Sequence, residues 1–371
     1  MRVAVLTSSR ADFGIYLPLL KKLKADTFFE LSIIAFGTHL SRFHGHTLDQ
    51  IEQADLTVNY TIESLLVGDS AEANSTATAL TAMKFAGFWA AHQSEFDLVF
   101  CLGDRYEMFA AVMAGVPFGI PFAHIHAGEK TLGAIDNIYR HSISHASVMH
   151  FTATQLSCER VKQLVDVPSH VHHVGALSLD NLAEIPLLDI PGFKDKWGID
   201  LSIPTILITF HPETVEHAKN KQFVKELVGA VHELLENYQV LITMPNADTE
   251  GNIVREGFLN GLNNSDRVFI IENLGTQSYF TAMANASLLL GNTSSGIIEA
   301  ASFGKYVINI GRRQEGREHG DNVIDEPIDT VSIVTAVNTI RNAKVLVKNN
   351  IYFNGGASGK IIEILKAEYK K

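Results

Sequence analysis

The chain has 371 residues, a net charge of −11 and two cysteines. This length predicts two domains, and two cysteines are too few for a disulfide framework. The acidic net charge disfavours non-specific nucleic-acid binding. The sequence shows no apolar run of about 20 residues and no signal-peptide pattern. We therefore expect a cytoplasmic protein without nucleic-acid or membrane partners.

Short β-branched runs alternate with helical patterns through the first half of the chain. The predicted strands are Arg2–Leu6, Leu31–Phe36, Leu98–Leu102, Phe122–Ile125, Met149–Thr152 and Val171–Val174. The predicted helices between them are Ile15–Lys24, Arg105–Ala114 and Ile138–His145. This alternation is typical of a parallel sheet covered by helices on both faces.

The alternation restarts after residue 175, which predicts α/β domains over residues 1–175 and 176–357. Strands are expected at Thr205–Phe210, Val240–Met244, Val268–Ile271, Leu288–Leu290 and Tyr306–Ile310. Helices are expected at Lys219–Leu235, Ile253–Leu262, Thr276–Ala284 and Gly296–Phe303. Two doubly wound, Rossmann-like halves predict a ligand cleft between them, beyond the C-terminal ends of the strands.

Candidate site residues in the first half follow predicted strands. Arg10 lies in the first strand-to-helix turn and offers a fork of donors suited to phosphate, although the turn lacks the GxGxxG fingerprint. Asp104 and Arg105 follow the apolar run Leu98–Leu102, where ligand sites form, but Asp104 could equally cap a helix.

The densest cluster of titratable groups follows the predicted strand Phe122–Ile125. It contains His126, Glu129, Asp136 and Arg140 in a glycine-containing loop, where acid/base groups are expected. A His-x-His metal site is disfavoured, because no third ligand stands at a characteristic spacing.

The second half offers a candidate site histidine and a phosphate-binding turn. His211 follows the predicted strand Thr205–Phe210 and faces the expected cleft, or it is structural. The segment Gly291–Glu299 predicts the end of a strand, a hydroxyl-rich turn and the start of a helix. Backbone N–H groups at the start of that helix would bind a diphosphate, and Glu299 would form a hydrogen bond with a ribose. A capping box is the alternative. Arginines after Tyr306–Ile310 would close over the diphosphate or lie in solvent.

Taken together, the motifs resemble the UDP-N-acetylglucosamine 2-epimerases, in particular the hydrolysing branch that feeds sialic-acid-type sugar synthesis. The resemblance rests on SSRADFG, FGTHL, LGDR, HIHAGE, GAIDN, RHS, FHPET, MPNAD, GNTSSGIIEAASFG and INIGRRQEGRE. It implies a GT-B-like fold and a C-terminal helix, residues 358–371, that packs back on the first domain. It implies no cofactor and no metal, a nucleotide-sugar substrate and a homo-oligomer, either a dimer or a tetramer.

The resemblance also implies residue roles. Asp104 and Asp136 look like catalytic acids, and Arg105 and His211 look like residues near the sugar and diphosphate. The residues that look like nucleotide contacts are Arg10, Asn246, Thr293, Ser294, Glu299 and Arg313.

The chain departs from its relatives at positions that bear on the reaction. Many relatives have a catalytic Glu at the position of His126, and the loop up to Asp136 is longer than in some of them. The remaining acid/base group is therefore His126 or Glu129. Some members carry Lys at the position of Ile15, which leaves UDP or GDP and the sugar substituents open.

The chemistry of C2 explains why such residues are needed. The proton on C2 of the sugar is not acidic until the nucleoside diphosphate leaves C1. A base can then remove that proton, which gives a glycal. Protonation of C2 from the opposite face and addition of water to C1 then give the free 2-epimer. The sequence leaves open a non-hydrolysing epimerase, a GT-B glycosyltransferase, a nucleotide-binding regulator and, least favoured, a metal hydrolase.

Overall fold

The computed structural model describes residues 1–41, 47–66, 68, 70–245, 250–262, 265–341, 343 and 348–370. These residues form two compact units. The first comprises Met1–Glu129, Asp136–Glu184 and Tyr352–Lys371, and the second comprises Lys130–Ile135 and Ile185–Ile351.

The boundary between the units lies beyond the expected residue 175, because the following residues are tied to the first unit. The Asn181 side chain donates to the carbonyl of Gly14 at 2.8 Å. The carboxylate of Asp180 accepts the backbone N–H groups of Ala357, at 3.0 Å, and Ser358, at 2.7 Å. The sequence patterns also did not predict that Lys130–Ile135 belongs to the second unit.

The first sheet is parallel, in the order β3-β2-β1-β4-β5-β6-β7. Its strands are β1 (Arg2–Thr7), β2 (Glu30–Phe36), β3 (Val58–Ile62), β4 (Leu98–Leu102), β5 (Phe122–Ile125), β6 (Ser147–Thr152) and β7 (Val171–His173). Alternation along β1 sends Val3 and Val5 into one core and Ala4 and Leu6 into the other, so both faces of the sheet are buried.

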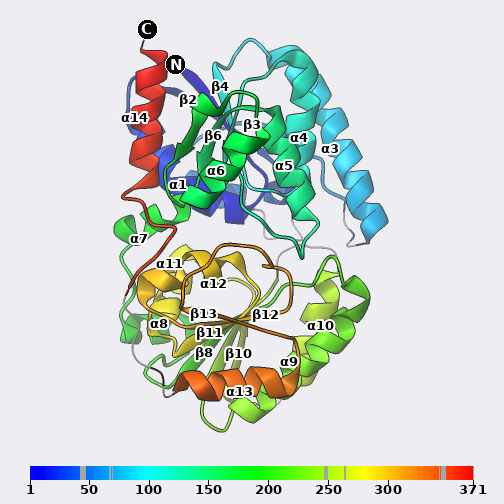
Figure 1. Ribbon diagram of the computed structural model, residues 1–371, viewed down its shortest axis with the longest axis vertical. Helices are drawn as coiled ribbons and strands as arrows, with labels where there is room; N and C mark the ends of the chain where they lie inside the picture. The colour runs from blue at the N-terminus through cyan, green and yellow to red at the C-terminus, as the bar shows by residue number, and fades with distance from the viewer. Residues whose placement is uncertain are drawn as a thin grey trace. The chain divides into compact units, whose positions relative to one another are not determined.

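Helices cover both faces of this sheet (Figure 1). They are α1 (Arg10–Ala25), α2 (Leu48–Gln53), α3 (Ala71–His92), α4 (Tyr106–Gly115), α5 (Asp136–Ala146), α6 (Gln155–Leu164), α7 (Asn181–Glu184) and α14 (Ala357–Tyr369). Apolar residues of α1 and α14 fill one core, and those of α3, α4 and α5 fill the other. The C-terminal helix α14 lies beside α1 in the first unit (Figure 1).

The second sheet is also parallel, in the order β10-β9-β8-β11-β12-β13. Its strands are β8 (Thr205–Thr209), β9 (Gln239–Thr243), β10 (Val268–Ile271), β11 (Leu288–Gly291), β12 (Val307–Ile310) and β13 (Val323–Glu326). The helices of this unit are α8 (Ile190–Trp197), α9 (Asn220–Leu234), α10 (Gly251–Leu262), α11 (Gly275–Asn285), α12 (Ser294–Ile298) and α13 (Thr330–Arg341).

The structure confirms the strands expected from sequence, but the patterns missed β3 and β13. Each lies at the edge of its sheet, and most of its side chains are half-buried or exposed. An edge strand needs no continuous apolar run, so its pattern is weak. The helix expected at Gly296–Phe303 is divided at Glu299 into α12 and the 3₁₀ turn η7 (Ala300–Phe303).

The strand order fixes where ligands are expected in each unit. In the first sheet β1 lies between β2 and β4, and in the second sheet β8 lies between β9 and β11. Connections run to opposite sides at these strands, which opens a crevice at their C-terminal ends. The loops after β1 and β4 carry Arg10 and Asp104, and those after β8 and β11 carry His211 and Thr293.

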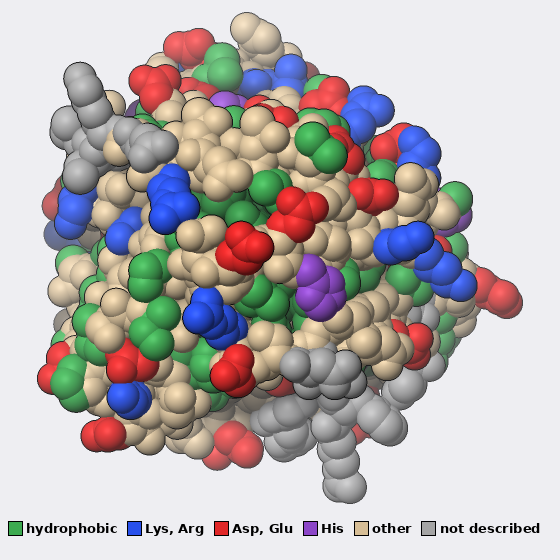
Figure 2. Space-filling view, turned by 90° about the horizontal axis from the view of Figure 1, so that it is seen from below, with side chains coloured by type: hydrophobic (Ala, Val, Ile, Leu, Met, Phe, Trp, Pro, Cys, Tyr) green, Lys and Arg blue, Asp and Glu red, His purple; other side chains and the backbone are tan. Residues whose placement is uncertain are grey.

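The surface and the helices bear on partners. Within the described ranges, no helix is long and apolar enough to cross a membrane. Figure 2 shows a face on which Lys and Arg side chains are interspersed with Asp and Glu. A mixed surface of this kind differs from the single-sign basic patch typical of nucleic-acid-binding domains.

Candidate active site

The turn after β1 is built by a buried carboxylate. Ser9 caps α1, and Asp12 accepts the backbone N–H groups of Ser8, at 2.7 Å, and Ser9, at 2.8 Å. The ring of His39 reaches Thr7 at 2.9 Å, and burial lowers its pKa. Asp12 is therefore a structural residue, and Ser9 and Asp12 together form a capping box at the start of α1. Arg10 is the first residue of α1 and is half-buried.

His124, at the end of β5, holds the loop that carries Asp104. Its Nε2–H donates to the carbonyl of Gly103 at 2.8 Å, since a carbonyl can only accept. Its Nδ1 therefore accepts the hydroxyl of Ser144 at 2.9 Å. Burial lowers the pKa of His124 to about 3. His124 is thus a neutral histidine that fixes the position of a loop.

Asp104 belongs to a continuous polar network in the first unit. Its carboxylate pairs with the Arg140 guanidinium, which comes from α5 and is buried. The other arm of Arg140 lies 3.3 Å from Glu129 Oε2, and Glu129 Oε1 lies 2.6 Å from His126 Nδ1. The side chains of Asp104, Arg140, Glu129 and His126 are therefore linked in that order.

His126 is the open end of this network. The Glu129 carboxylate accepts, so Nδ1 carries a proton, and in a neutral ring Nε2 is then the acceptor. His126 Nε2 is buried and has no hydrogen-bond partner among the described residues. The backbone of His126 has φ +62°, a strained conformation for a residue with a side chain. This is the arrangement of a base oriented by a carboxylate.

Arg105 and Asp136 lie beside the network. Arg105 caps α4, and its guanidinium forms two hydrogen bonds with the buried Glu107, at 3.0 and 3.2 Å. Asp136 is in the first turn of α5, one turn before Arg140, so the two side chains share a helix face. The Arg that pairs with Asp104 is Arg140, which the sequence placed in the cluster of titratable groups without assigning it a partner.

In the second unit, Asn292 joins the ends of β8 and β11. Its side-chain oxygen accepts the backbone N–H of His211 at 2.7 Å, and its amide donates to the His211 carbonyl at 2.8 Å. Gln314 in turn donates to the carbonyl of Asn292 at 2.8 Å. This side-chain clamp fixes the backbone of His211, a buried residue at the C-terminal edge of the sheet.

Glu213 organises the arginine loop after β12. Its Oε1 accepts the backbone N–H groups of Arg312, at 3.0 Å, and Arg313, at 3.1 Å. Burial raises the pKa of Glu213, against the lowering effect of these bonds. The loop has no room for a side chain at Gly311, where an added Cβ would lie 2.4 Å from Glu213 Oε1.

The segment Lys130–Ile135 lies against this arginine loop. The backbone N–H of Leu132 donates to the carbonyl of Glu315 at 2.8 Å. A Cβ at Gly133 would lie 1.7 Å from the Arg312 carbonyl oxygen, so only glycine fits there. The chain therefore leaves the first unit directly after Glu129 and returns to it at Asp136.

The expected phosphate turn follows β11. Thr293 caps the short helix α12 through the N–H of Ser295 at 3.4 Å, Ser294 opens that helix, and the buried Glu299 ends it. Glu299 is thus a residue of the turn between α12 and η7 and is not solvent-facing. Asn246 lies outside the described residues.

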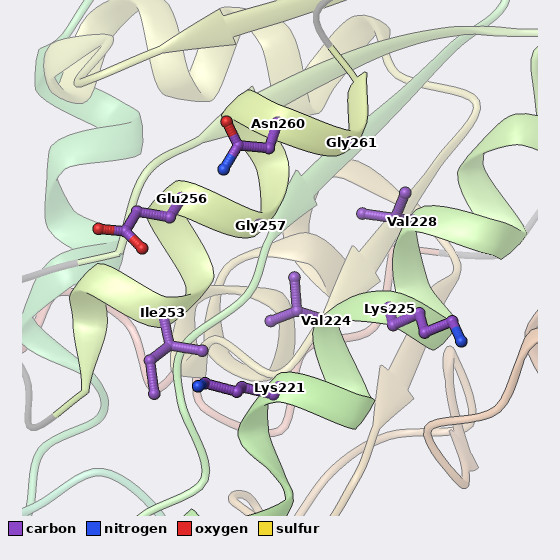
Figure 3. A pocket seen from close by; sticks show the side chains of 9 residues that line it. All are labelled: Lys221, Val224, Lys225, Val228, Ile253, Glu256, Gly257, Asn260 and Gly261. Atoms are coloured by element: carbon purple, nitrogen blue, oxygen red, sulfur yellow. The ribbon is translucent and has the colours of Figure 1, made fainter.

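A surface pocket of about 350 Å³ lies elsewhere in the second unit, between α9 and α10 (Figure 3). The two helices are in close contact at this pocket, because an added Cβ at Gly257 of α10 would lie 2.2 Å from Val224 Cγ1 of α9. Lys221, Lys225 and Glu256 line its walls. It contains none of the site residues expected from sequence.

The family model described as UDP-N-acetylglucosamine 2-epimerase matches residues 21–366. The chain belongs to this family. It is 34% identical to the UDP-N,N'-diacetylbacillosamine 2-epimerase (hydrolyzing) of Legionella pneumophila, over 98% of this chain and 95% of that protein. It is 32% identical to the GDP/UDP-N,N'-diacetylbacillosamine 2-epimerase (hydrolyzing) of Campylobacter jejuni, over 88% and 85%.

The fold of this family member is likewise that of solved relatives. The crystal structure of UDP-GlcNAc 2-epimerase from Neisseria meningitidis bound to UDP-GlcNAc superposes with a TM-score of 0.83. That comparison covers 99% of this chain and 100% of the other at 19% identity, which establishes the two-domain, GT-B-like fold. The resemblance drawn from the motifs is confirmed.

Sequence reasoning missed residues that lie inside the motifs it selected. Arg140 stands in RHS, Glu213 in FHPET and Asn292 in GNTSSG. All three are buried and act on other groups of the site, Arg140 on carboxylates and the other two on backbone. The available signal was the presence of each residue in a selected motif, and that signal does not say which partner the residue contacts.

The protonation state of His124 can be measured. Because burial lowers its pKa to about 3, we expect its ring to stay neutral, with Nε2 protonated, from about pH 5 to 8. NMR of ring-labelled histidine, assigned with His124→Gln, tests this. A His124 resonance that titrates within that range would contradict the loop-holding role.

Proposed function

We propose that this family member is a hydrolysing 2-epimerase. It converts a nucleotide-linked N-acetylhexosamine, UDP-GlcNAc or a further modified derivative, into the free 2-epimer and a nucleoside diphosphate. The observation that carries the proposal is the network that runs from Asp104 through Arg140 and Glu129 to His126, whose Nε2 has no hydrogen-bond partner among the described residues. Two relatives above 30% identity, both named as hydrolysing 2-epimerases, support it.

In the first step the bond from C1 to the diphosphate breaks and a base removes the C2 proton. We assign the base to His126 Nε2, which Glu129 orients through Nδ1. This choice between His126 and Glu129 follows from their contacts, since both oxygens of Glu129 already contact other side chains. The products are the nucleoside diphosphate and a glycal with a double bond between C1 and C2.

In the second step water adds across the double bond. A proton reaches C2 from the face opposite to the one that lost it, and hydroxide adds to C1. Two acid/base groups on opposite faces are needed for inversion, and we assign Asp104 and Asp136 as the carboxyl groups of this step. Asp104 is about a quarter exposed beside Arg140, so it is accessible to a ligand while its orientation is fixed.

The second unit supplies the binding of the leaving group in this proposal. Negative charge develops on the diphosphate as it leaves, and fixed donors stabilise that charge. We assign Thr293, Ser294 and Arg313 to the diphosphate, Glu299 to the ribose, and Arg10 and Asn246 to the nucleotide, as the family resemblance implies. His211 and Arg105 are assigned to the region where the sugar meets the diphosphate.

Product identification tests the reaction itself. We expect incubation in D₂O with UDP- and GDP-linked HexNAc and diacetamido sugars to release nucleoside diphosphate and a free sugar. That sugar carries inverted C2 with deuterium, because C2 is reprotonated from solvent. NMR of the products reports both features.

Each competing reaction has a distinct outcome. An inverted sugar still linked to its nucleotide would make the enzyme non-hydrolysing. Turnover that requires an acceptor and leaves C2 unchanged would make it a glycosyltransferase. Retention of the substrate's own C2 proton would exclude the glycal route.

Substitutions separate the acid/base groups from the group that orients them. We expect His126→Gln to lower kcat by about 100-fold or more, because general-base catalysis contributes about 10²–10⁴. Asp104→Asn and Asp136→Asn should lose nearly all turnover. Glu129→Gln should lose less, about tenfold, because it keeps an acceptor for Nδ1–H.

The control for these variants is His217→Gln, which removes an exposed histidine paired with Glu250 at 3.4 Å. Binding of UDP, measured by calorimetry, should stay near the wild-type value in all of them. Wild-type kcat in the His126 variant would remove that residue from the mechanism and return the base to Glu129.

A further inference from the structure

A second group of metal-ligating side chains lies in the first unit, apart from the acid/base network. His170, His172 and Glu368 each offer one ligand atom, and these atoms all lie within 4.8 Å of one another. The histidines come from the 3₁₀ turn η4 (Pro168–His170) and from β7, and Glu368 comes from the last turn of α14. Figure 1 shows α14 as the red helix of this unit.

Packing brings these three side chains together. Ala357, Ile361 and Leu365 recur at a helical spacing and bury one face of α14 in the core of the first unit. Glu368 follows Leu365 by three positions, so it extends the packed face at the end of the helix. The ring of His172 is stacked on Phe151, with centroids 5.8 Å apart, which restricts its orientation.

The distances fit a small tetrahedral ion. His170 Nδ1 lies 3.1 Å from Glu368 Oε2, and His172 Nε2 lies 3.3 Å from Glu368 Oε1. Zinc bonds of about 2.0–2.2 Å to nitrogen and oxygen separate adjacent tetrahedral ligands by about 3.4 Å. The two nitrogens therefore already stand on either side of the carboxylate at about the spacing that one ion requires.

The donor set is also chemically suited to this ion. Imidazole nitrogen binds Zn²⁺ well, and two histidines with one carboxylate leave a fourth tetrahedral position for water. The site is partly exposed, with 43% of the His170 side chain and 26% of the Glu368 side chain accessible, so an ion can enter. Simple histidine–carboxylate pairing is the alternative reading of the same contacts.

We propose that His170, His172 and Glu368 bind one Zn²⁺ ion and thereby fasten the C-terminal helix to the edge strand β7. β7 is the last strand in the sheet order; His172 is its middle residue, and His170 directly precedes it. None of the three ligands contacts Asp104, Glu129 or His126 through a described hydrogen bond. The proposed site is therefore separate from the acid/base network, and its removal is expected to act on the stability of the first unit.

Metal binding to the full-length protein tests this proposal. After treatment with chelator and its removal, we expect equilibrium dialysis against Zn²⁺ to load one ion per chain. His172→Ala and Glu368→Gln should each weaken that binding by tenfold or more. X-ray absorption of the loaded protein should show two imidazole nitrogens among light-atom ligands and no sulfur.

Stability gives an independent readout. Zn²⁺ should raise the midpoint of thermal unfolding of the wild type and leave that of His172→Ala unchanged, because ligands that bind the folded state stabilise it. The matched control is His92→Ala, which removes a histidine 2.8 Å from Glu95 without a second histidine in the pair. Circular dichroism confirms that each variant is folded.

The overturning results are equally specific. A wild type that takes up no Zn²⁺ in dialysis, or a folded His172→Ala, Glu368→Gln double variant that binds as tightly as the wild type, would refute the site. If His92→Ala lost as much Zn²⁺ binding as His172→Ala does, the proposed location of the site would be refuted.

Discussion

The buried guanidinium of Arg140 is the group on which the polar network of the first unit depends. A buried charge is strongly destabilising unless it is paired and hydrogen-bonded. Here the pairing is supplied by Asp104, which follows β4, and by Glu129, which follows β5. Because each carboxylate and the guanidinium compensate one another, the loops after two neighbouring strands and the helix α5 are held in a single arrangement.

The same constraint explains why a histidine can stand where many relatives have a glutamate. Glu129 contacts Arg140 with one oxygen and His126 with the other, so the carboxylate orients the ring that we propose as the base. The strained backbone of His126 is tolerated because the turn is over-determined by these contacts and by Gly128. At Gly128 an added Cβ would lie 2.4 Å from the Ser157 carbonyl oxygen.

The second unit uses neutral and backbone groups to the same end. Asn292 fixes both polar groups of the His211 backbone, and Glu213 fixes the N–H groups that begin the arginine loop. The chain between the proposed site residues Glu129 and Asp136 belongs to this unit. The segment that contacts the arginine loop is thus continuous in the chain with the residues Glu129 and Asp136 on either side of it.

Much of this architecture could be predicted from sequence, because apolar runs and the polar residues that end them are local features. β4 and β5 were predicted with their exact bounds, and Asp104 and His126 were selected because they follow them. The role of Arg140 could not be predicted, because its partner Asp104 lies 36 residues away on another element. The sequence selected Arg105 as a site residue beside Asp104, and the Arg105 side chain contacts Glu107.

The most direct test of this account is the Arg140→Lys substitution, which keeps the charge and loses the two-armed geometry. The account predicts a fall in kcat of at least about tenfold, following the loss of oriented acid/base groups, with the dissociation constant for UDP unchanged. The variant and the wild type are measured side by side. A kcat equal to that of the wild type, or a loss of UDP affinity as large as the loss of kcat, would contradict the account.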